Sequence, residues 1–520
     1  MARFDERISQ EVNMLTGRTF PESMVTASPA AALGRSGRAG QRADTSETWV
    51  NDVHSQLNRA RVRRVIRPRS IGSLQTVVRE AGADGRALSV AGGRHAMGGQ
   101  QFATDADLVD MTAMNRVVSF DHEKGLIEVE AGIQWPELID DLLEAQRARA
   151  PQWGIIQKQT GADRLSLGGA LAANVHGRGL TLRPIIADVE SFLLVDADGR
   201  VRNCSRRENA ELFRLVIGGY GLFGIVATVT LRLAPRTKLQ RVVEIIEIDR
   251  LICAFDERIA SGFRFGDFQY STDPTSEGFL RKGVFSCYRP VDPATPIAED
   301  QKKLSDEDWT KLLYLGHVDR RRAFEKYSAY YLSTSGQIYW SDTHQLSTYI
   351  DNYHQELDRR LRSVEPATEM ITEIYVPRSA LVDFMEDVRR DFRQHDVDLI
   401  YGTIRLIERD DESFLAWARE PFACVIFNLH TVHDAKGLAK TAADFRRLID
   451  RGIQYGGSYY LTYHRWASRA QVETCYPRFA EFLRLKRKHD PAERFQSDWY
   501  RHYRAMFADT LATDPAEQCP

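Results

Sequence analysis

The sequence of 520 residues lacks the features that mark several classes of protein. It has no uninterrupted apolar run of about 18 residues, so we expect no segment that spans a membrane. The 70 basic and 72 acidic side chains give a net charge of −2, and this balance argues against nucleic acid as a partner, because phosphate contacts need a basic excess. The N-terminal residues MARFDERISQEV are charged and contain no apolar stretch, which argues against a secretory signal peptide.

Cysteine is scarce and scattered along the chain. The six cysteines are Cys204, Cys253, Cys287, Cys424, Cys475 and Cys519. None stands in a CxxC pair, so the pattern indicates neither a disulfide framework nor a zinc site, and it favours a cytoplasmic location. The segment HTVH, residues 430–433, places its histidines on opposite faces of a strand and therefore gives no zinc motif. We predict no metal site from the sequence.

Composition divides the chain into parts. Hydrophobic residues make up 43% of the sequence, enough for two or three domains with cores of their own. Residues 1–45 are predicted to be a flexible leader, because the stretch that ends near Trp49 is small, polar and rich in glycine. Residues 46–237 then mix strands and helices and are dense in glycine. From about 238 onward glycine thins and aromatic residues increase, which places a domain boundary near Pro235.

Periodicity predicts particular elements. SIGSLQTVVREAGADG reads as a helix that Ser70 can cap, and WPELIDDLLEAQRAR reads as a helix with Pro136 in its first turn. FLLVDADGRVRNCS reads as a hairpin that turns at Asp198 and Gly199. In the second half, ITEIYV, VIFNLHTV and SYYLTY are typical of strands. ALVDFMEDVRRDFRQ and QVETCYPRFAEFLRLKRK are each predicted to form one long amphipathic helix.

Three glycine-rich segments could carry chemistry, and each also has a purely structural interpretation. VAGGRHAMGGQ, residues 90–100, offers bare backbone N–H groups that suit a phosphate, but it lacks GxGxxG and could equally be a turn with a solvent-facing His95. RLSLGGALAANVHGRG, residues 164–179, has small residues that suit a flat ligand or a tightly packed backbone. IGGYGLFGIVATVTL, residues 217–231, is explained by close packing as well as by ligand contact.

The order and spacing of these segments resemble the FAD-binding domain of the vanillyl-alcohol oxidase and p-cresol methylhydroxylase (PCMH) superfamily, over residues 60–235. The resemblance returns in YPRFAEFLRLKRKHDPAERFQSDW near the C-terminus. NVHGRG, GGSYYLTY and DPAERFQSDW are most similar to decaprenylphosphoryl-ribose oxidases, whereas GGRHAMGGQ and GTIRLIERDD are more similar to alditol and aldonolactone oxidases. The first of these branches lacks the histidine at His95 and has a lysine where this chain has Tyr463.

The resemblance implies an α+β fold with two domains. A PCMH-type FAD-binding domain would span residues 46–237, and the segment 489–520 would return to complete it. Residues 238–488 would form a substrate or cap domain, an antiparallel sheet with helices on one side that closes over the flavin.

The resemblance also implies which residues hold FAD. His95 falls where many members bond a histidine covalently to the 8α methyl group of the flavin. The other implied contacts are Gly92, Gly93, Arg94, Ala96, Met97 and Gly98 at the pyrophosphate, Gly168, Gly169, Ala170, Asn174, His176 and Gly177 along the flavin, and Gly221 and Ile225 at the adenine half.

A flavin that takes hydride at N5 needs a positioned substrate and a proton acceptor close to the substrate hydroxyl. The predicted catalytic residues are His176, Arg405, His430, Tyr463 and His464, and Arg405 stands where alditol oxidases polarise a substrate oxygen. The predicted substrate contacts are Arg178, Tyr375, Asn428 and Tyr460. Alternation along TEIYVPR places Glu373 on the same face as Tyr375. The alternative for each strand residue is a merely solvated polar side chain.

We therefore predict an FAD-dependent oxidoreductase that oxidises a CH–OH group of a polyol, sugar or sugar lactone. Its partners would be this small-molecule substrate and an electron acceptor such as oxygen, a quinone or another redox partner. One alternative is a flavin-dependent tailoring oxidase that acts on a natural-product alcohol or amine. An alternative of another class is a catalytically silent scaffold that keeps the fold for binding.

Overall fold

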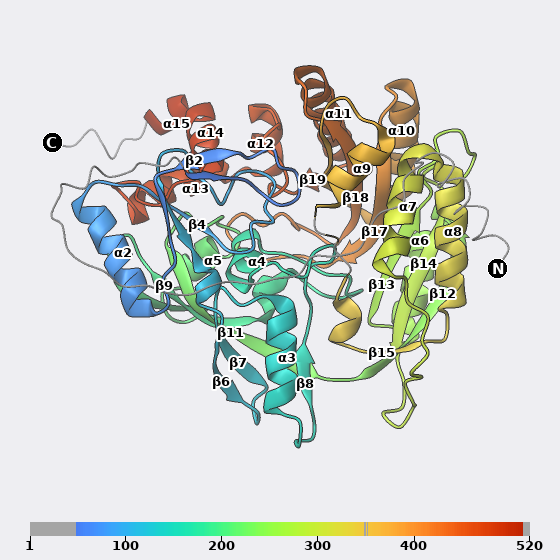
Figure 1. The fold of residues 1–520 in the computed structure, drawn as a ribbon, viewed down its shortest axis with the longest axis horizontal. Coiled ribbons are helices and arrows are strands. Elements are labelled where there is room, and N and C mark those ends of the chain that lie inside the picture. The colour runs from blue at the N-terminus through green and yellow to red at the C-terminus, as the bar shows by residue number, and fades with distance from the viewer. Residues whose placement is uncertain (1–47, 348–349, 351, 513–520) are drawn as a thin grey trace, which may run out of the picture. The chain divides into compact units, whose positions relative to one another are not determined.

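Short strands and glycine-rich turns dominate the first part of the chain in the computed structural model (Figure 1). The structure describes residues 48–347, 350 and 352–512, so the predicted leader 1–45 lies outside the described residues. A parallel sheet has the strand order β3-β5-β4, and β1 pairs with β2. These strands are β1 (Thr48–Val50), β2 (Ala60–Val62), β3 (Arg64–Ile66), β4 (Leu88–Ala91) and β5 (Asp107–Asp110).

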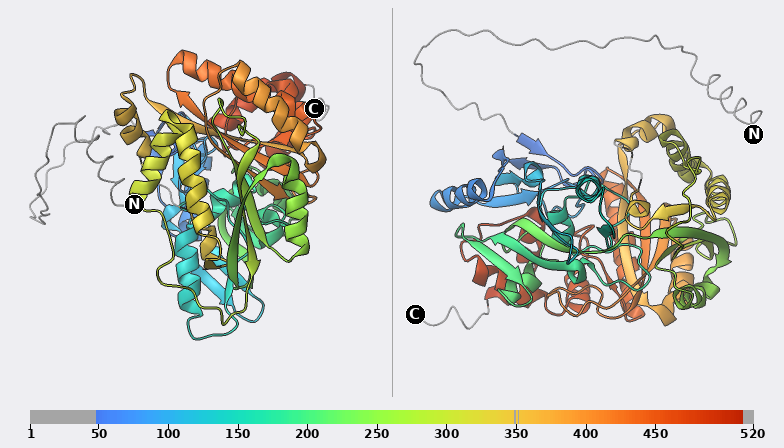
Figure 2. Two further views of the ribbon diagram at one scale, coloured as in Figure 1. Left: turned by 90° about the vertical axis from the view of Figure 1, so that its right-hand side faces the viewer. Right: turned by 90° about the horizontal axis from the view of Figure 1, so that it is seen from below.

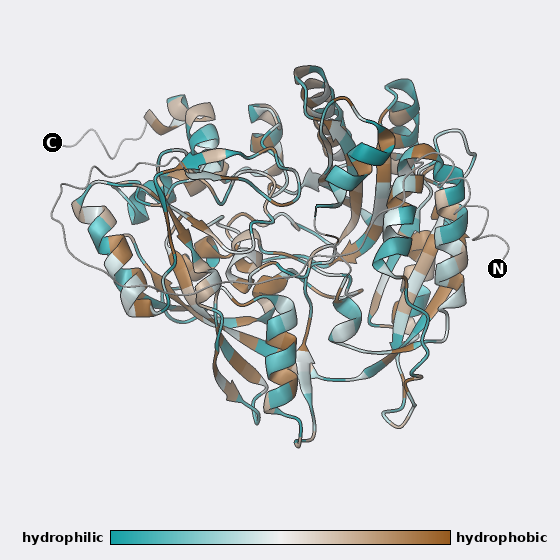
Figure 3. Ribbon diagram, viewed as in Figure 1, coloured by the Kyte–Doolittle hydropathy of each residue, from teal (hydrophilic) through white to brown (hydrophobic). Residues whose placement is uncertain are grey.

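A second, antiparallel sheet follows in the order β10-β9-β11-β7-β6, and β8 pairs with β11. Its strands are β6 (Val117–Asp121), β7 (Leu126–Glu130), β8 (Trp153–Ile155), β9 (Val189–Val195), β10 (Val201–Ser205) and β11 (Ile225–Pro235). The predicted hairpin is confirmed, because β9 pairs with β10 and Gly199 takes a φ of 73° in the connecting turn. Figure 3 shows hydrophobic residues concentrated in these strands.

The helices of this part follow the sequence pattern closely. They are α2 (Ile71–Ala83), α3 (Trp135–Ala145), α4 (Leu167–Ala173) and α5 (Ala210–Val216). In α2 the Ser70 side chain accepts a hydrogen bond from the backbone N–H of Ser73, and Leu74 and Val78 are buried, as predicted. Pro136 stands in the first turn of α3, where its missing N–H costs nothing.

The chain after Pro235 builds one large antiparallel sheet in the order β15-β12-β14-β13-β17-β18-β16-β19 (Figure 2). Its strands are β12 (Lys238–Glu247), β13 (Phe265–Tyr270), β14 (Lys282–Pro290), β15 (Ile338–Trp340), β16 (Ala367–Pro377), β17 (Leu399–Ile407), β18 (Phe422–Val432) and β19 (Ser458–Tyr459). The accompanying helices are α6 (Leu251–Ala260), α7 (Asp306–Val318), α8 (Arg320–Ser333), α9 (Tyr353–Leu361), α10 (Leu381–Gln394) and α11 (Ala435–Gln454). The predicted antiparallel sheet is thus present.

Helices cover both faces of this sheet, so the expectation of helices on one side is wrong. Ile374 of β16 faces α11, since a Cβ atom added to Gly452 would lie 2.7 Å from Ile374 Cγ2. Glu369 of the same strand has the opposite parity, and it receives a hydrogen bond from His317 of α7. Alternate residues of a strand point to opposite faces. α7 therefore lies on the face opposite α11, and amphipathic patterns alone could not assign the faces.

The predicted long helix QVETCYPRFAEFLRLKRK is also wrong as a single element. The chain forms α12 (Arg469–Cys475) and α13 (Phe479–His489), with Tyr476 between them at φ −129° and ψ 74°. Pro477 disfavours the helical conformation at the residue before it, which explains the break at Tyr476. Two further helices, α14 (Asp498–Met506) and α15 (Ala508–Ala512), follow.

The C-terminal segment returns to the parallel sheet. Phe495 forms a parallel bridge with Leu88 of β4, and the Leu88 N–H donates to the carbonyl of Arg494. Leu88 and Phe495 share a buried cluster with Leu74 and Val78 of α2. The described residues belong to one compact unit. In the part of the chain that the structure describes, every helix is too short or too polar to cross a membrane.

Candidate active site

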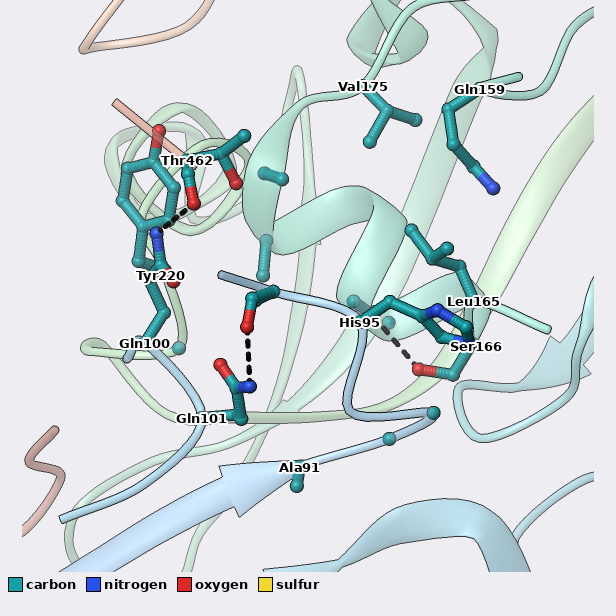
Figure 4. Close-up of a pocket in the computed structure, with 18 of the residues that line it drawn as sticks. Ala91, His95, Gln100, Gln101, Gln159, Leu165, Ser166, Val175, Tyr220 and Thr462 are labelled. Atoms are coloured by element: carbon teal, nitrogen blue, oxygen red, sulfur yellow. Dashed lines mark hydrogen bonds between the residues drawn. The ribbon is translucent and has the colours of Figure 1, made fainter. Parts of the chain in front are cut away.

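A cavity lies where the three glycine-rich segments meet the large sheet. The predicted residues that line it are Gly92, Gly93, Arg94, His95, Ala96, Met97, Gly168, Gly169, His176, Gly221, Ile225, Arg405, Tyr460 and Tyr463. Figure 4 shows part of its wall, with His95 beside Leu165 and Ser166. The structure therefore brings together most of the residues that the sequence singled out.

The loop after β4 is pressed against the segment that leads into α4. A Cβ atom at Gly92 would lie 1.8 Å from Ser166 Oγ, and one at Gly93 would lie 2.1 Å from the carbonyl oxygen of Arg164. Side chains at these positions cannot fit, so the loop requires glycine for close backbone approach. Arg94 between them and His95 takes a φ of 60°, a left-handed conformation that costs free energy in a non-glycine residue.

His95 is paired with a second histidine at the cavity. Its Nδ1 atom lies 2.9 Å from Nε2 of His54, and both residues line the cavity. Burial, followed by positive charge on His95 and His354, lowers the pKa of His54 to about 3. His54 is therefore neutral at physiological pH, so the pair can share one proton between the two rings.

The second glycine-rich segment forms α4 and the turn behind it. Ser166 caps α4 by accepting a hydrogen bond from the Gly169 N–H at 3.3 Å, and a Cβ atom at Gly168 would lie 3.1 Å from Ala131. Asn174 ends α4 in the left-handed conformation, and its amide donates to Asp410 Oδ2 at 2.8 Å. Asn174 thus fastens the end of α4, and it does not line the cavity.

Three other residues predicted to contact FAD do not line the cavity. They are Gly98, Ala170 and Gly177. A Cβ atom at Gly177 would lie 2.6 Å from the carbonyl oxygen of Lys158, so this glycine allows two backbone segments to pass closely. In the third segment Gly221 has a φ of 75°, and a Cβ atom there would meet no atom within 4 Å. Gly221 therefore borders open space.

Glu373 is the centre of a buried hydrogen-bond network at the cavity wall. Its Oε2 atom lies 2.9 Å from His176 Nε2, and its Oε1 atom accepts a hydrogen bond of 2.6 Å from the Tyr463 hydroxyl. The Tyr375 hydroxyl donates to Oε2 at 2.8 Å. Within the described part of the chain, Glu373 is the one carboxylate that lines the cavity.

The charge of Glu373 is compensated by buried protein groups in this network. Burial alone would raise the pKa of Glu373, but the charge and hydrogen bond of His176, the hydrogen bond of Tyr463 and the charge of Arg405 outweigh it and lower the pKa to about 2. His176 Nδ1 faces the carbonyl oxygen of Gly177 at 3.1 Å, while its Nε2 faces the carboxylate. Both ring nitrogens face acceptors, so hydrogen bonds at both require the imidazolium form.

Four predicted residues lie behind the wall or away from it. His464 is buried beside Phe445 of α11, and burial, followed by the charge of Arg446, lowers its pKa to about 3. His430 contacts Glu369, and Arg178 donates to the carbonyl oxygen of His344. Asn428 on β18 is half-buried and does not line the cavity.

Two further predicted residues, Tyr375 and Tyr460, lie next to the hydrogen-bond network of Glu373. Tyr375 reaches Glu373 but does not line the cavity. Tyr460 lines the cavity, and its hydroxyl donates to the carbonyl oxygen of Ala173 at 2.5 Å. The Tyr460 ring therefore contributes a surface, while its polar group is already paired with the end of α4.

Several lining residues were not predicted from the sequence. His54, Gln100, Gln101, Gln159 and Tyr220 all line the cavity. Gln100 donates to the carbonyl oxygen of Thr462 at 2.7 Å, and Gln101 donates to that of Ala96 at 2.6 Å (Figure 4). These two follow the GGRHAMGG loop directly, so adjacency to it was the signal that could have found them. His54 lies some 40 residues before His95, in a segment without a motif.

A buried aspartate supports the backbone next to His176. Gln157 Nε2 donates to Asp188 Oδ2 at 2.9 Å, and Gln157 Oε1 accepts from the Gly177 N–H at 3.3 Å. Burial raises the pKa of Asp188 from 3.8 to about 7, although the Gln157 hydrogen bond and the charges of Arg232 and Arg206 oppose this. The folded chain therefore holds this proton at a pH where the unfolded chain has lost it.

We expect Asp188→Asn to stabilise the protein increasingly as the pH rises from about 4 to 7. Below pH 3.8 both states are protonated, whereas above it the unfolded state gains by ionising, so wild-type stability falls until the folded pKa is passed. The gain should approach roughly 4 kcal/mol at most, at ~1.4 kcal/mol per pH unit. Melting temperatures at pH 5 and pH 8 measure it, with exposed Asp198→Asn as the control. A difference that does not change with pH would contradict this assignment.

Comparison with known proteins identifies the class. Residues 62–205 match the family model described as an FAD binding domain. This match confirms the predicted resemblance to FAD-linked oxidoreductases over this region.

Several relatives are aldonolactone oxidases or dehydrogenases by name. The chain is 31% identical over 173 residues to L-gulonolactone oxidase of Mus musculus, and 30% identical over 174 residues to a putative D-arabinono-1,4-lactone oxidase of Neurospora crassa. These alignments cover 33% and 34% of this chain, but only 37% and 30% of the two relatives. L-gulono-1,4-lactone dehydrogenase of Mycobacterium tuberculosis is 22% identical over 445 residues, which cover 84% of this chain and 95% of that protein. The similarity is thus to aldonolactone oxidases and dehydrogenases.

Proposed function

We propose that the chain is an FAD-dependent oxidoreductase that oxidises a CH–OH group of a sugar lactone, with sugars and polyols as related substrates. The observation that carries the proposal is the pair Glu373 and Arg405, a buried carboxylate and a buried guanidinium on the wall of a cavity built largely from FAD-binding segments. Such a pair can orient a substrate hydroxyl and receive its proton. The names of three relatives all specify aldonolactones, which favours a lactone.

The chemistry of the cavity fits an FAD molecule. Buried Nε of Arg405 and Oε1 of Gln101 have no hydrogen-bond partner in the part of the chain that the structure describes. Unpaired buried polar atoms are costly, so a polar ligand at these positions would be stabilising. Gly221 adds open space without a side chain. When bound, FAD supplies the acceptor for the hydride that leaves the substrate carbon.

We propose that His95 bonds covalently to the flavin 8α methyl carbon. In support, His95 lines the cavity inside the glycine loop, and its Nδ1 atom lies next to the neutral ring of His54. If His95 replaced a hydrogen of the 8α methyl group, the bound flavin would take up the two electrons of that oxidation, and the neutral His54 imidazole beside His95 would accept a released proton. The predicted loop residues Gly92, Gly93, Arg94, Ala96 and Met97 would then hold the pyrophosphate.

Of the predicted catalytic residues Tyr463, His430 and His464, Tyr463 lines the cavity. Burial, followed by the charge of Glu373, raises the pKa of its hydroxyl well above 10, so the phenol keeps its proton at neutral pH. We propose that Glu373 is the proton acceptor, and that Tyr463 and His176 fix the orientation of its carboxylate. A titration near neutrality in the pH profile that vanishes in His430→Ala would instead favour the imidazole.

We propose the domain limits 46–237, 238–488 and 489–520 for the FAD-binding, cap and returning segments. The cap sheet begins at Lys238, next to the proposed boundary between residues 237 and 238.

Oxygen, a quinone or another redox partner would reoxidise the flavin. The scattered cysteines favour a cytoplasmic location. A tailoring oxidase of a natural-product alcohol or amine is the second candidate, and a silent scaffold is the third.

Anaerobic reduction distinguishes these candidates. The purified protein should be yellow, and its blue absorption band should bleach when L-gulono-1,4-lactone or a polyol is added without oxygen. Bleaching by an amine but by none of the sugar derivatives would favour the tailoring oxidase. A colourless protein that takes up no FAD would contradict the proposal and favour the scaffold.

A further inference from the structure

A second cluster of titratable side chains lies on the large sheet, outside the lining of the cavity. It consists of Glu369 on β16, His430 on β18, His317 on α7 and His354 on α9. We call these four residues the Glu369 cluster. Glu369 and His430 are direct partners in the antiparallel register of β16 and β18. Four separate elements therefore each place one metal-ligating side chain at the same point.

The distances within the cluster are short. His317 Nε2 lies 3.0 Å from Glu369 Oε1, and His430 Nδ1 lies 3.9 Å from the same oxygen. His354 Nδ1 lies 3.1 Å from Glu369 Oε2. The ligand atoms of His317, Glu369 and His430 all lie within 4.8 Å of one another. Tetrahedral coordination with metal–ligand bonds of 2.0–2.2 Å places ligand atoms about 3.4 Å apart, which matches this spacing.

Some buried ring nitrogens of the Glu369 cluster have no hydrogen-bond partner in the described part of the chain. They are both ring nitrogens of His354 and Nδ1 of His430. A buried nitrogen that faces a carboxylate without a hydrogen bond lowers the stability of the folded protein unless another group binds that nitrogen. A cation between the rings and the carboxylate would bind it.

We propose that the Glu369 cluster binds one divalent transition-metal ion of the zinc type, through Glu369, His317 and His430. Two imidazoles and one carboxylate are a donor set that suits such ions. HTVH contributes one ligand only, because His433 contacts Thr368 Oγ1 at 2.9 Å. The other ligands come from distant elements, so local spacing could not reveal the site.

The site is structural rather than part of the active site. Glu369 precedes Glu373 by four residues on one strand, a separation of about 13 Å at ~3.3 Å per residue. Glu369 is also absent from the cavity lining. An ion bound there would link α7 to β16 and β18. Occupancy should therefore raise the melting temperature and leave the flavin spectrum unchanged.

Zinc titration of the full chain tests the proposal. Chelator-treated wild type should bind one equivalent of ZnCl₂ by calorimetry, and its melting temperature should rise by a few degrees. His317→Ala and Glu369→Gln should weaken binding at least tenfold and abolish the rise. His395→Ala is the matched control, because His395 follows α10 on the other face and contacts Asp391. It should bind like wild type.

Two results would overturn the proposal. One is a wild-type chain that binds no zinc; the other is equally tight binding in wild type, His317→Ala and Glu369→Gln, which would indicate an adventitious ion only. If the variants do not fold, zinc-edge anomalous scattering from wild-type crystals decides the question. A peak between Glu369 and His317 supports the site, and zinc-soaked crystals without a peak there exclude it.

Discussion

Glu373→Gln is expected to lower the turnover number about 10²- to 10⁴-fold, the usual contribution of a positioned acid or base. The substitution keeps the size of the side chain but removes the charge that accepts hydrogen bonds from Tyr463 at 2.6 Å and faces His176 at 2.9 Å. Arg405 would then face an uncharged amide. Stopped-flow measurement of flavin reduction by the lactone gives the rate directly.

The flavin content of this variant should stay at the wild-type value, because Glu373 lies on β16 and not in the glycine-rich loops. Exposed Glu365→Gln, just before the same strand, is the control and should reduce its flavin at the wild-type rate. Because the pKa of Glu373 is about 2, the carboxylate stays ionised over the assay range, so its loss should lower the whole pH profile without moving it. An unchanged rate in Glu373→Gln would transfer the role of base to another residue.

His95→Ala is expected to abolish covalent flavin attachment completely. Wild-type protein denatured in SDS should keep its yellow fluorescence on the polypeptide, whereas the variant should release all of its flavin. Alanine removes the nitrogen that forms the bond but leaves the close packing of Gly92 and Gly93 intact, so FAD should still bind without the covalent link. Fluorescence of the denatured band measures the attached fraction.

His122→Ala serves as the control for this experiment, because His122 contacts the carbonyl oxygen of Pro151 and does not line the cavity. It should retain full attachment. His54→Ala should slow attachment during reconstitution with FAD, since it removes the neighbour of His95 Nδ1. Free FAD in the supernatant of denatured wild type would falsify the covalent link while leaving FAD binding itself in place.

Local patterns predicted much of the first part of the fold. Ser70 marked the start of α2, and Asp198 with Gly199 marked the turn between β9 and β10. The glycine-rich loops also marked the cavity wall, because a segment that must pass within van der Waals contact of another backbone can hold only glycine. Gly93 against the carbonyl oxygen of Arg164 is the clearest case.

The same reasoning failed where two interactions competed. QVETCYPRFAEFLRLKRK has a continuous helical periodicity, but Pro477 ends the helix in spite of it. His464 is a polar residue in a strand-like run, and it proved to be buried beside Phe445 instead of lining the cavity. Periodicity shows on which side of its own helix or strand a residue lies. It does not show which other element packs against that side.

The sequence by itself determined the helix caps, the hairpin turn and the glycine positions, because each of these depends on a few neighbouring residues. Tertiary structure alone decided that Glu373 meets His176, which is 197 residues away in the chain. It also decided that Glu369 meets histidines from three other elements. Strand register and helix packing bring such residues together, and the free energy that fixes them comes from burial of the whole core rather than from any local motif.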